Sequence, residues 1–253
     1  MHSMAFNGLR LPRLGAMRGG GGGPGIPSIA SAVYWGDFSD TSKVSLSSGK
    51  ITGLANRLGG ALSFSQTDDS LQPTYQLASA GNGINGLNTC RFTESTQELY
   101  LDTAALADAT IVIVVRNTAN LTSGAILNST NNNFAGLFHT SYGDEHSNNP
   151  GGISDNFVDG VDIVNTREIT KSALGTSAVL FMVRNIDLTA WGNSSSISAI
   201  RLGRFWGGGT TYSFTGGDMG EIVVMNAPSV AEQNALGSYL SEKWGTATWT
   251  DVS

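Results

Sequence analysis

The sequence has one cysteine, Cys90, so it forms no disulfide within the chain, and its stability must come from packing. Only 13% of its 253 residues are charged, yet no run approaches the roughly 20 consecutive apolar residues that a membrane-spanning helix needs. Arg, Pro and Gly interrupt the first 18 residues, so these lack the apolar core of a signal peptide. We expect no membrane span and no signal peptide, and we expect Cys90 to be a small buried hydrophobic residue.

The short motifs of common enzyme classes are also missing. The three histidines lack the H-x-x-x-H and H-E-x-x-H spacings of zinc sites, and neither a G-x-S-x-G elbow nor a phosphate-binding G-x-x-x-x-G-K-[ST] occurs. A glycosidase needs two carboxylates roughly 5–10 Å apart. The E-x-D-x-x-E pattern of sandwich glycosidases is absent, and Asp144 and Glu145 lie in a polar stretch typical of a solvated loop. We therefore expect no catalytic residues and no enzymatic activity.

Negative charge dominates, but it is unevenly distributed. The net charge is −6, yet three of the 14 Lys and Arg residues lie among the first 18 residues, which hold no acid. The remaining 11 basic residues face all 20 acidic residues, so the rest of the chain has a net charge of −9. Binding to a nucleic-acid backbone needs clustered Lys and Arg, so nucleic acid is not an expected partner of the folded body.

Thirty-three glycines and many short apolar runs separated by turn residues predict an all-β protein. Thr110–Val115 and Val179–Val183 are continuous apolar runs of strand length, as expected for central strands buried on both faces. The regular spacing of the runs favours a β-sandwich over βαβ units, and Thr103–Ala109 would form one helical turn at most. The expected strands are Ala32–Trp35, Ala61–Ser65, Thr89–Phe92, Glu98–Leu101, Thr110–Arg116, Gly124–Asn128, Phe134–His139, Val158–Val164, Ala178–Arg184, Ile197–Leu202 and Gly220–Met225.

One segment, at about residues 229–244, has all the features of a helix. Ser229 and Glu232 form the S-x-x-E pattern of a capping box. Gly245 follows the last turn, where a left-handed residue commonly ends a helix. A stripe of apolar residues recurs every four positions and predicts packing of one helix face onto a β-core. The residues of this stripe are Leu236, Leu240 and Trp244.

The same C-terminal region carries a family resemblance. The pattern G-x-x-G-E-I at residues 217–222, the capping box and the sequence YLSEKWG resemble the end of concanavalin A-like (laminin-G-like) β-sandwich domains. Trp35, Asp37 and Asp40 resemble the opening strand of these domains, and Gln72–Tyr75 and Thr89–Leu101 resemble later blocks. Such domains occur in secreted bacterial proteins and in tailed-bacteriophage virion proteins. The resemblance covers roughly residues 33–245 and implies a concanavalin A-like jelly-roll sandwich. It does not imply one function, because this fold hosts lectins, hydrolases and structural modules.

Residues 1–29 are expected to form an extended, glycine-rich, basic arm, and residues 30–253 the sandwich with its helix. Gly19–Gly23 are five successive glycines, which lose much backbone entropy on ordering, so one interpretation is a flexible tether. The other interpretation is a docking peptide, because apolar and basic residues alternate before the glycines. The expected docking residues are Phe6, Leu9, Arg10, Leu11, Arg13, Leu14 and Arg18.

Two long loops, Tyr142–Asn156 and Gly192–Ser196 with Phe205–Tyr212, are expected at an edge of the sandwich, where binding residues commonly lie. Aromatic rings there can stack on a sugar while polar groups hydrogen-bond to it. The alternative for Trp206 is that it packs beneath its own glycine-rich loop. The expected glycan-binding residues are Trp206, Tyr212, Tyr142 and Asp144.

No cofactor is expected. The carboxylates that come nearest to a calcium site are Asp155, Asp159 and Asp162, which lie close together in sequence around Gly160. Calcium needs six or more oxygen ligands, and no complete EF-hand pattern accompanies these three residues.

These features together lead to a functional expectation. The chain would be a non-enzymatic structural protein of a tailed-phage virion, in the first place a capsid decoration protein anchored by its arm. Its partners would be the major capsid protein or other virion proteins, further copies of itself, and cell-surface glycans. The alternatives are a tail or fibre protein, or a free-standing carbohydrate-binding lectin module. A glycan depolymerase of the same fold is a third hypothesis, against which the missing carboxylate pattern argues.

Overall fold

The computed structural model describes residues 25–103, 106–118, 126–129, 136–137, 155–163, 173, 175–188, 198–207 and 210–253. Within them, fifteen strands form one hydrogen-bonded sheet, thirteen of them in a continuous path with β1 and β2 paired to its side, two more strands form a separate hairpin, and the strand pairs are antiparallel. The chain is thus an all-β protein with a C-terminal helix. Its elements are β1 (Ala32–Asp37), β2 (Val44–Ser47), β3 (Lys50–Ala55), β4 (Ser63–Ser65), β5 (Thr74–Gln76), the 3₁₀ turn η1 (Ala78–Ala80), β6 (Thr89–Phe92), β7 (Leu99–Thr103), β8 (Ala109–Asn117), β9 (Leu127–Ser129), β10 (Gly136–Leu137), β11 (Asp155–Val158), β12 (Val161–Ile163), β13 (Val179–Ile186), β14 (Ser198–Leu202), β15 (Arg204–Gly207), β16 (Thr210–Ser213), β17 (Gly217–Asn226) and α2 (Val230–Trp244).

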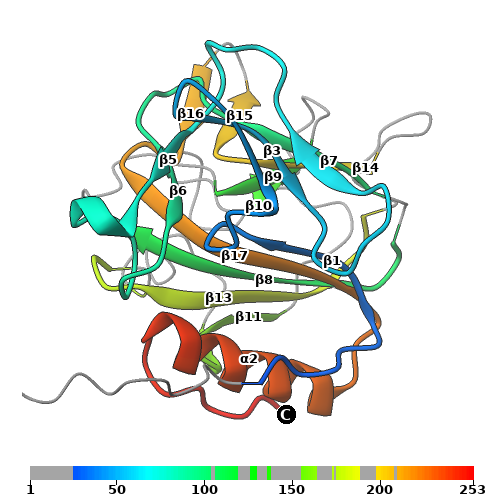
Figure 1. The fold of residues 1–253 in the computed structure, drawn as a ribbon. Helices are drawn as coiled ribbons and strands as arrows, with labels where there is room; N and C mark the ends of the chain where they lie inside the picture. The colour runs from blue at the N-terminus through cyan, green and yellow to red at the C-terminus, as the bar shows by residue number, and fades with distance from the viewer. Residues whose placement is uncertain are drawn as a thin grey trace, which may run out of the picture.

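The strands are arranged in two facing layers (Figure 1). The first layer contains β1, β17, β8, β13 and β11, and the second contains β3, β4, β7, β14 and β9. Between them, β5 and β6 continue the path from one layer to the other. Side chains from both layers form one buried cluster, which includes Phe181 of the first layer and Phe64 and Leu101 of the second. The fold is therefore a β-sandwich.

The two central strands of the first layer are buried on both faces. In β8, Ile111, Ile113 and Val115 belong to the core between the layers, whereas Val112 and Val114 belong to a second cluster that includes α2. The same alternation runs along β13, whose first five residues are all buried. Because alternate residues of a strand face opposite ways, a continuous apolar run satisfies both clusters. The prediction of two central strands is confirmed, and Cys90 is confirmed as buried in β6.

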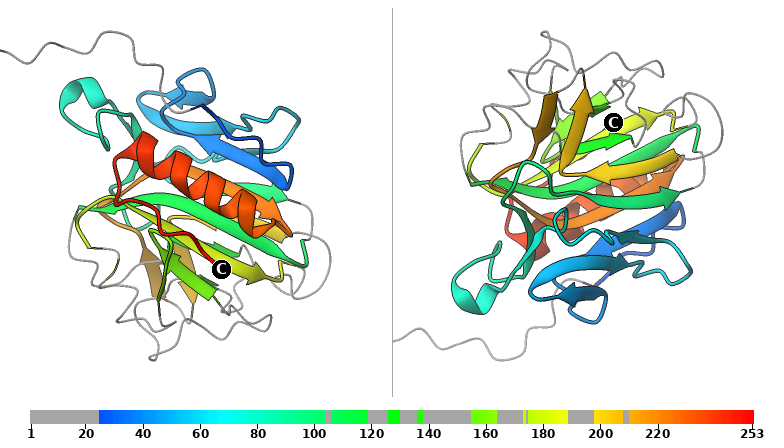
Figure 2. Two further views of the ribbon diagram at one scale, coloured as in Figure 1. Left: turned by 90° about the horizontal axis from the view of Figure 1, so that it is seen from below. Right: turned by 90° about the horizontal axis from the view of Figure 1, so that it is seen from above.

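The helix begins and ends where the sequence predicts. The backbone N–H of Glu232 donates to Ser229 Oγ at 3.3 Å, and Glu232 Oε2 accepts the N–H of Ser229 at 3.0 Å, which completes the capping box. Gly245 takes the left-handed conformation after the last turn. The predicted stripe packs onto the first layer, and α2 lies lengthwise along that face (Figure 2). Burial of side chains of this size stabilises the fold by about 1.5–3 kcal/mol each.

After Gly245 the chain turns back along α2. Asn234 on the helix fixes this C-terminal segment: its Oδ1 accepts the backbone N–H of Val252 at 2.8 Å and the indole N–H of Trp249 at 3.2 Å. Both of these partners are buried. The indole lies directly against Gly237, where an added Cβ would overlap the ring. A glycine is therefore required inside the helix at this position.

This contact predicts an unusual effect for Gly237→Ala. In an exposed helix the change would stabilise by about 1 kcal/mol, because glycine is a poor helix former. Here we expect a loss of about 1–3 kcal/mol, because the methyl group displaces Trp249. Urea unfolding measures it. The control is the pair Gly237→Ala/Trp249→Ala: without the indole, the alanine should no longer cost stability relative to Trp249→Ala alone, and a persisting loss would contradict the packing argument.

One predicted strand is wrong. Residues 155–163 form a hairpin of β11 and β12, whereas the sequence analysis placed a single strand at Val158–Val164. The two turn residues, Asp159 and Gly160, have positive φ angles of 51° and 83°. Asp-Gly is favoured in two-residue hairpin turns for this reason. The sequence contains this Asp-Gly turn pair, but the apolar residues on either side of it favoured a single continuous strand in the prediction.

The segment expected to be a loop at Phe205–Tyr212 also contains structure, because β15 and β16 pair as a hairpin. The short strands β2, β3 and β5 were not predicted. Thr103 and Ala109, the ends of the expected helical turn, belong to β7 and β8 instead. At the other boundary, Ile29, assigned to the arm, is buried against the cluster under α2.

Candidate functional site

Three of the sequence blocks that carry the family resemblance, those of β1, β17 and the end of α2, meet in one place. Asp37 on β1 lies opposite Glu221 on β17 in the strand register. Lys243, in the last turn of α2, places its Nζ 2.6 Å from Asp37 Oδ2 and 2.6 Å from Glu221 Oε2. Glu221 also accepts hydrogen bonds from two indoles, those of Trp35 and, at 2.7 Å, Trp244. One residue from each block is thus bonded to Glu221 or is Glu221 itself.

A fourth charged side chain completes this cluster. Arg57, which follows β3, approaches Asp37 Oδ2 to 3.2 Å and Glu221 Oε1 to 3.8 Å. Its guanidinium also donates to Tyr239 Oη of α2 at 3.3 Å. The set therefore holds two carboxylates and two cations and is formally neutral. We call Asp37, Arg57, Glu221 and Lys243, with their two indole donors, the Glu221 network.

Burial dominates the electrostatics of this network. The Glu221 side chain is 0% exposed and that of Asp37 is 4% exposed. Burial, reinforced by the charge of Asp37, raises the pKa of Glu221 against the opposing charge of Lys243. Burial alone would lower the pKa of Lys243, but the charges of Glu221 and Asp37 outweigh it and the pKa lies above its ordinary value. The paired carboxylates are thus closed off from solvent, and their geometry joins α2 to two strands.

A second charged cluster lies further along β17. The carboxylate of Asp218 is 0% exposed and is held by two arginines on the neighbouring strands, Arg91 of β6 and Arg116 of β8. Arg91 donates from Nε at 2.6 Å and from Nη2 at 2.8 Å. Arg116 donates from Nε at 3.1 Å and from Nη2. One buried carboxylate is therefore matched by two guanidinium groups.

A third cluster lies on the second layer. Glu98, immediately before β7, is buried and accepts a hydrogen bond from Tyr100 Oη. Arg201 and Arg204 each approach its carboxylate to 3.4 Å. Burial, and then the bond to Glu98, raises the pKa of Tyr100 to about 12. This cluster again combines one carboxylate with two arginines.

The structure places the three carboxylates that come nearest to a calcium site in the sequence. Asp155 pairs with Arg184 at 3.0 Å and accepts from Asn185 Nδ2 at 3.0 Å. Asp159 accepts the backbone N–H of Leu180 at 2.9 Å, and Asp162 lies exposed on β12. In the part of the chain with described coordinates, no three His, Cys, Asp or Glu side chains gather as metal ligands. Asp155 and Asp159 thus bond to β13, whereas Asp162 lies apart from them on β12.

The expected glycan-binding residues are only partly placed. Trp206 lies on β15 opposite Thr211, and Tyr212 lies on β16 opposite Phe205, so the register gives the two residues different cross-strand partners. Their side chains lie outside the described part of the chain, as do Tyr142 and Asp144 entirely. The docking residues of the arm, between Phe6 and Arg18, also lie outside it. Both roles stay predictions.

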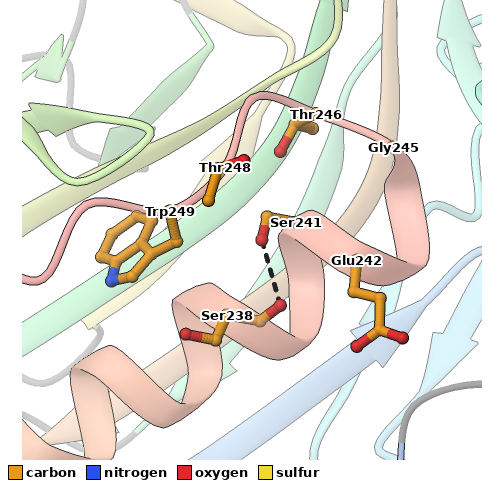
Figure 3. Close-up of a pocket in the computed structure, with 7 residues that line it drawn as sticks. All are labelled: Ser238, Ser241, Glu242, Gly245, Thr246, Thr248 and Trp249. Carbon is orange, nitrogen blue, oxygen red and sulfur yellow. Dashed lines mark hydrogen bonds between the residues drawn. The ribbon is translucent and has the colours of Figure 1, made fainter.

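A shallow hollow lies between α2 and the returning C-terminal segment (Figure 3). Hydroxyl groups line much of it, and Ser241 Oγ already donates to the Ser238 carbonyl at 3.0 Å. Glu242 points away from its floor (Figure 3). The lining residues thus place no paired acid and base side by side. They are Ser238, Ser241, Glu242, Gly245, Thr246, Thr248 and Trp249.

Sequence reasoning found Trp35, Asp37, Glu221 and Lys243 as parts of a resemblance but assigned them no contacts. It missed Arg57 and the acids at the centres of the two-arginine clusters. One signal was visible: β8 and β13 both carry Val-Arg-Asn at or near their C-terminal ends, and in each the arginine pairs with an acid on a neighbouring strand. The partners are far apart in sequence, and only strand register brings them together.

Fold and site define a class: a β-sandwich whose outer face carries a C-terminal helix, held by a buried ionic network. Searches against protein families, curated proteins and solved structures find no match to this chain. Among the helices in the described part of the chain, none has the length and apolar character to cross a membrane.

Proposed function

We propose that the chain is a non-enzymatic structural protein of a tailed-phage virion, and specifically a capsid decoration protein. In this proposal the N-terminal arm before Ile29 anchors it, and the sandwich is displayed outward, where it adheres to glycans. The particular placement is supported by the resemblance to concanavalin A-like domains and by the sequence of the arm. A tail or fibre position is the alternative within the same class.

The observation that carries the proposal is that the Asp37–Glu221 carboxylate pair is buried and bonded to Lys243. Asp37 and Glu221 lie together, as acid–base chemistry would require, but both are buried and each bonds to Lys243. A general acid or nucleophile must reach the substrate directly or through one water. These two carboxylates instead fix α2 on the sandwich. The residues on which the resemblance rests therefore support a structural role.

The junction between arm and sandwich suits an anchor. The backbone N–H of Ser31 donates to Glu232 Oε1 at 2.9 Å, which ties the chain entering β1 to the first turn of α2. This bond, and then that from the Ser229 backbone, lowers the pKa of Glu232 to about 2, so it is charged at neutral pH. A pull on the arm would reach the sandwich at a point fixed to both the sheet and the helix.

The arm also complements the body in charge. The basic residues Arg10, Arg13 and Arg18 precede a body with a net charge of −9. The arm is therefore suited to an acidic partner surface, whereas the acidic body is not. Arginine forms planar paired bonds with carboxylates, and the intervening leucines can fill apolar pockets of a capsid protein. Many copies on one particle would make weak individual glycan contacts effective through avidity.

Deletion of residues 1–24 tests the anchor. We expect incorporation into particles to fall by about tenfold or more, because each lost apolar anchor or arginine contact contributes roughly 1 kcal/mol or more. Quantitative mass spectrometry of purified particles measures incorporation, and thermal unfolding of the isolated variant checks that the sandwich is intact. The matched control is Arg10→Lys/Arg13→Lys/Arg18→Lys, which keeps the charge. Incorporation of the deletion variant at the level of the intact chain would contradict the anchoring role of the arm.

The same samples separate the lectin alternative. A free-standing lectin would bind glycans without any particle and would be indifferent to deletion of residues 1–24. Trp206→Ala then shows whether the β15–β16 hairpin contributes to glycan binding under either scheme.

A further inference from the structure

The Asp218 cluster has more positive charge than its structural role requires. A single arginine would neutralise the buried carboxylate, yet both Arg91 and Arg116 bind it. The cluster therefore has a net charge of +1 in a body with a net charge of −9. Each guanidinium uses its Nε and Nη2 on Asp218, which fixes its orientation and leaves Nη1 directed elsewhere.

The position of the cluster makes it accessible. Arg91 lies between Cys90 and Phe92, which both point into the core, so Arg91 points to the outer face of the sheet. Asp218 and Arg116 share that face, because they are register partners on adjacent strands. The helix ends nearby, where Trp244 packs on Gly220. The arginine side chains keep 23% and 26% of their surface exposed.

We propose that Arg91 and Arg116 form an oxyanion-binding site that takes the carboxylate of an acidic sugar. The ligand class rests on the proposed function, in which this domain is displayed and adheres to glycans. A guanidinium held rigidly by one carboxylate loses little further freedom when it binds a second, and its planar N–H groups match carboxylate geometry. Asp218 is the positioning residue of the site: its carboxylate orients both guanidinium groups and restricts their rotation.

The test uses the full chain and galacturonate as the probe, with galactose as the uncharged counterpart. Chemical shifts of the arginine Nε–Hε groups report binding at the two side chains. We expect galacturonate to shift both signals at millimolar concentration, and galactose to shift neither. Arg116→Ala should weaken binding by about tenfold, the typical effect of losing one charge-assisted hydrogen-bonding partner. Asp218 remains paired with Arg91 in this variant, so the fold should survive.

Two controls make the result decisive. Lys43→Ala removes the same unit of charge from a lysine outside the described ion pairs, and we expect it to change affinity by less than about twofold. Arg116→Lys keeps the charge but loses the planar geometry, and it should fall between the two. Equal losses in Lys43→Ala and Arg116→Ala, or no shift with galacturonate, would overturn the site. Tighter binding of a tetra-glutamate peptide than of galacturonate would overturn the sugar assignment.

Failure of this site and failure of the proposed function are distinguishable. Arg116→Ala should be incorporated into particles at the normal level, because the arm supplies the anchor. Loss of galacturonate binding with normal incorporation supports both proposals. A chain that binds no galacturonate but still requires residues 1–24 for incorporation overturns only the oxyanion site.

Discussion

Replacing Glu221 with glutamine is expected to destabilise the protein by about 3–5 kcal/mol, the usual cost of removing one partner from a buried ionic network. The change alters the volume little but removes an acceptor. Glu221 accepts from Trp35 through one oxygen and from Trp244 and Lys243 through the other. In glutamine one of these atoms becomes an NH₂ donor, which must face an indole N–H or an ammonium group. Lys243 and Arg57 are then left with Asp37 as their remaining carboxylate partner.

Urea unfolding measures this effect, with Glu242→Gln as the matched control. Glu242 lies on the same helix but is exposed, so its neutralisation should change stability by less than about 0.5 kcal/mol. If the two variants were equally stable, the Glu221 network would not hold α2 on the sandwich.

Trp244→Ala is the second change expected to have a large effect, a loss of about 3–5 kcal/mol. Trp244 is fully buried, closes the apolar stripe of α2 and donates to Glu221. Its ring also lies against Gly220, where an added Cβ would approach it to 2.6 Å. The sheet backbone therefore comes too close to the helix for another side chain to fill the space left by the indole.

Trp244→Phe separates the two contributions of this residue. It keeps much of the apolar surface and loses the N–H, so a loss of about 1–3 kcal/mol is expected from an acceptor left short of a donor. Val230→Ala, at an exposed position in the first turn of α2, is the control and should stay within about 1 kcal/mol of the parent protein. A loss for Trp244→Ala no larger than that of the control would mean that the C-terminal end of α2 contributes little to the fold.

Local sequence signals accounted for much of the fold. The bounds of α2 follow from Ser229, Glu232 and Gly245, because capping depends on residues within one turn. The strands β8 and β13 follow from uninterrupted apolar runs, since a sandwich strand covered by a helix has two apolar faces to fill. The strands β2, β3 and β5 carry no such run, and a threonine and a glycine separate the buried Ile51 and Leu54 of β3, so composition did not distinguish them from loops.

The charged clusters were beyond prediction for a different reason. Arg91 and Asp218 are separated by 127 residues, and Arg57 and Tyr239 by 182. Such contacts depend on which strands are neighbours and in what register, and a slip of one residue would send each side chain to the opposite face. The resemblance placed Asp37, Glu221 and Lys243 in separate sequence blocks and assigned them no contact with one another. In the structure they meet at one buried junction of β1, β17 and α2.

Glu221 and Lys243 act on each other to hold the fold, and a double-mutant cycle measures this coupling. The free energies of unfolding of Glu221→Gln, Lys243→Met and the combined variant would be measured in urea and compared with that of the parent chain. We expect a coupling free energy of about 2 kcal/mol or more, because each single change leaves a buried charged or polar group without its partner, and the combined change removes both groups. Additive losses, with a coupling near zero, would contradict it and would reopen a role for this carboxylate pair outside the fold.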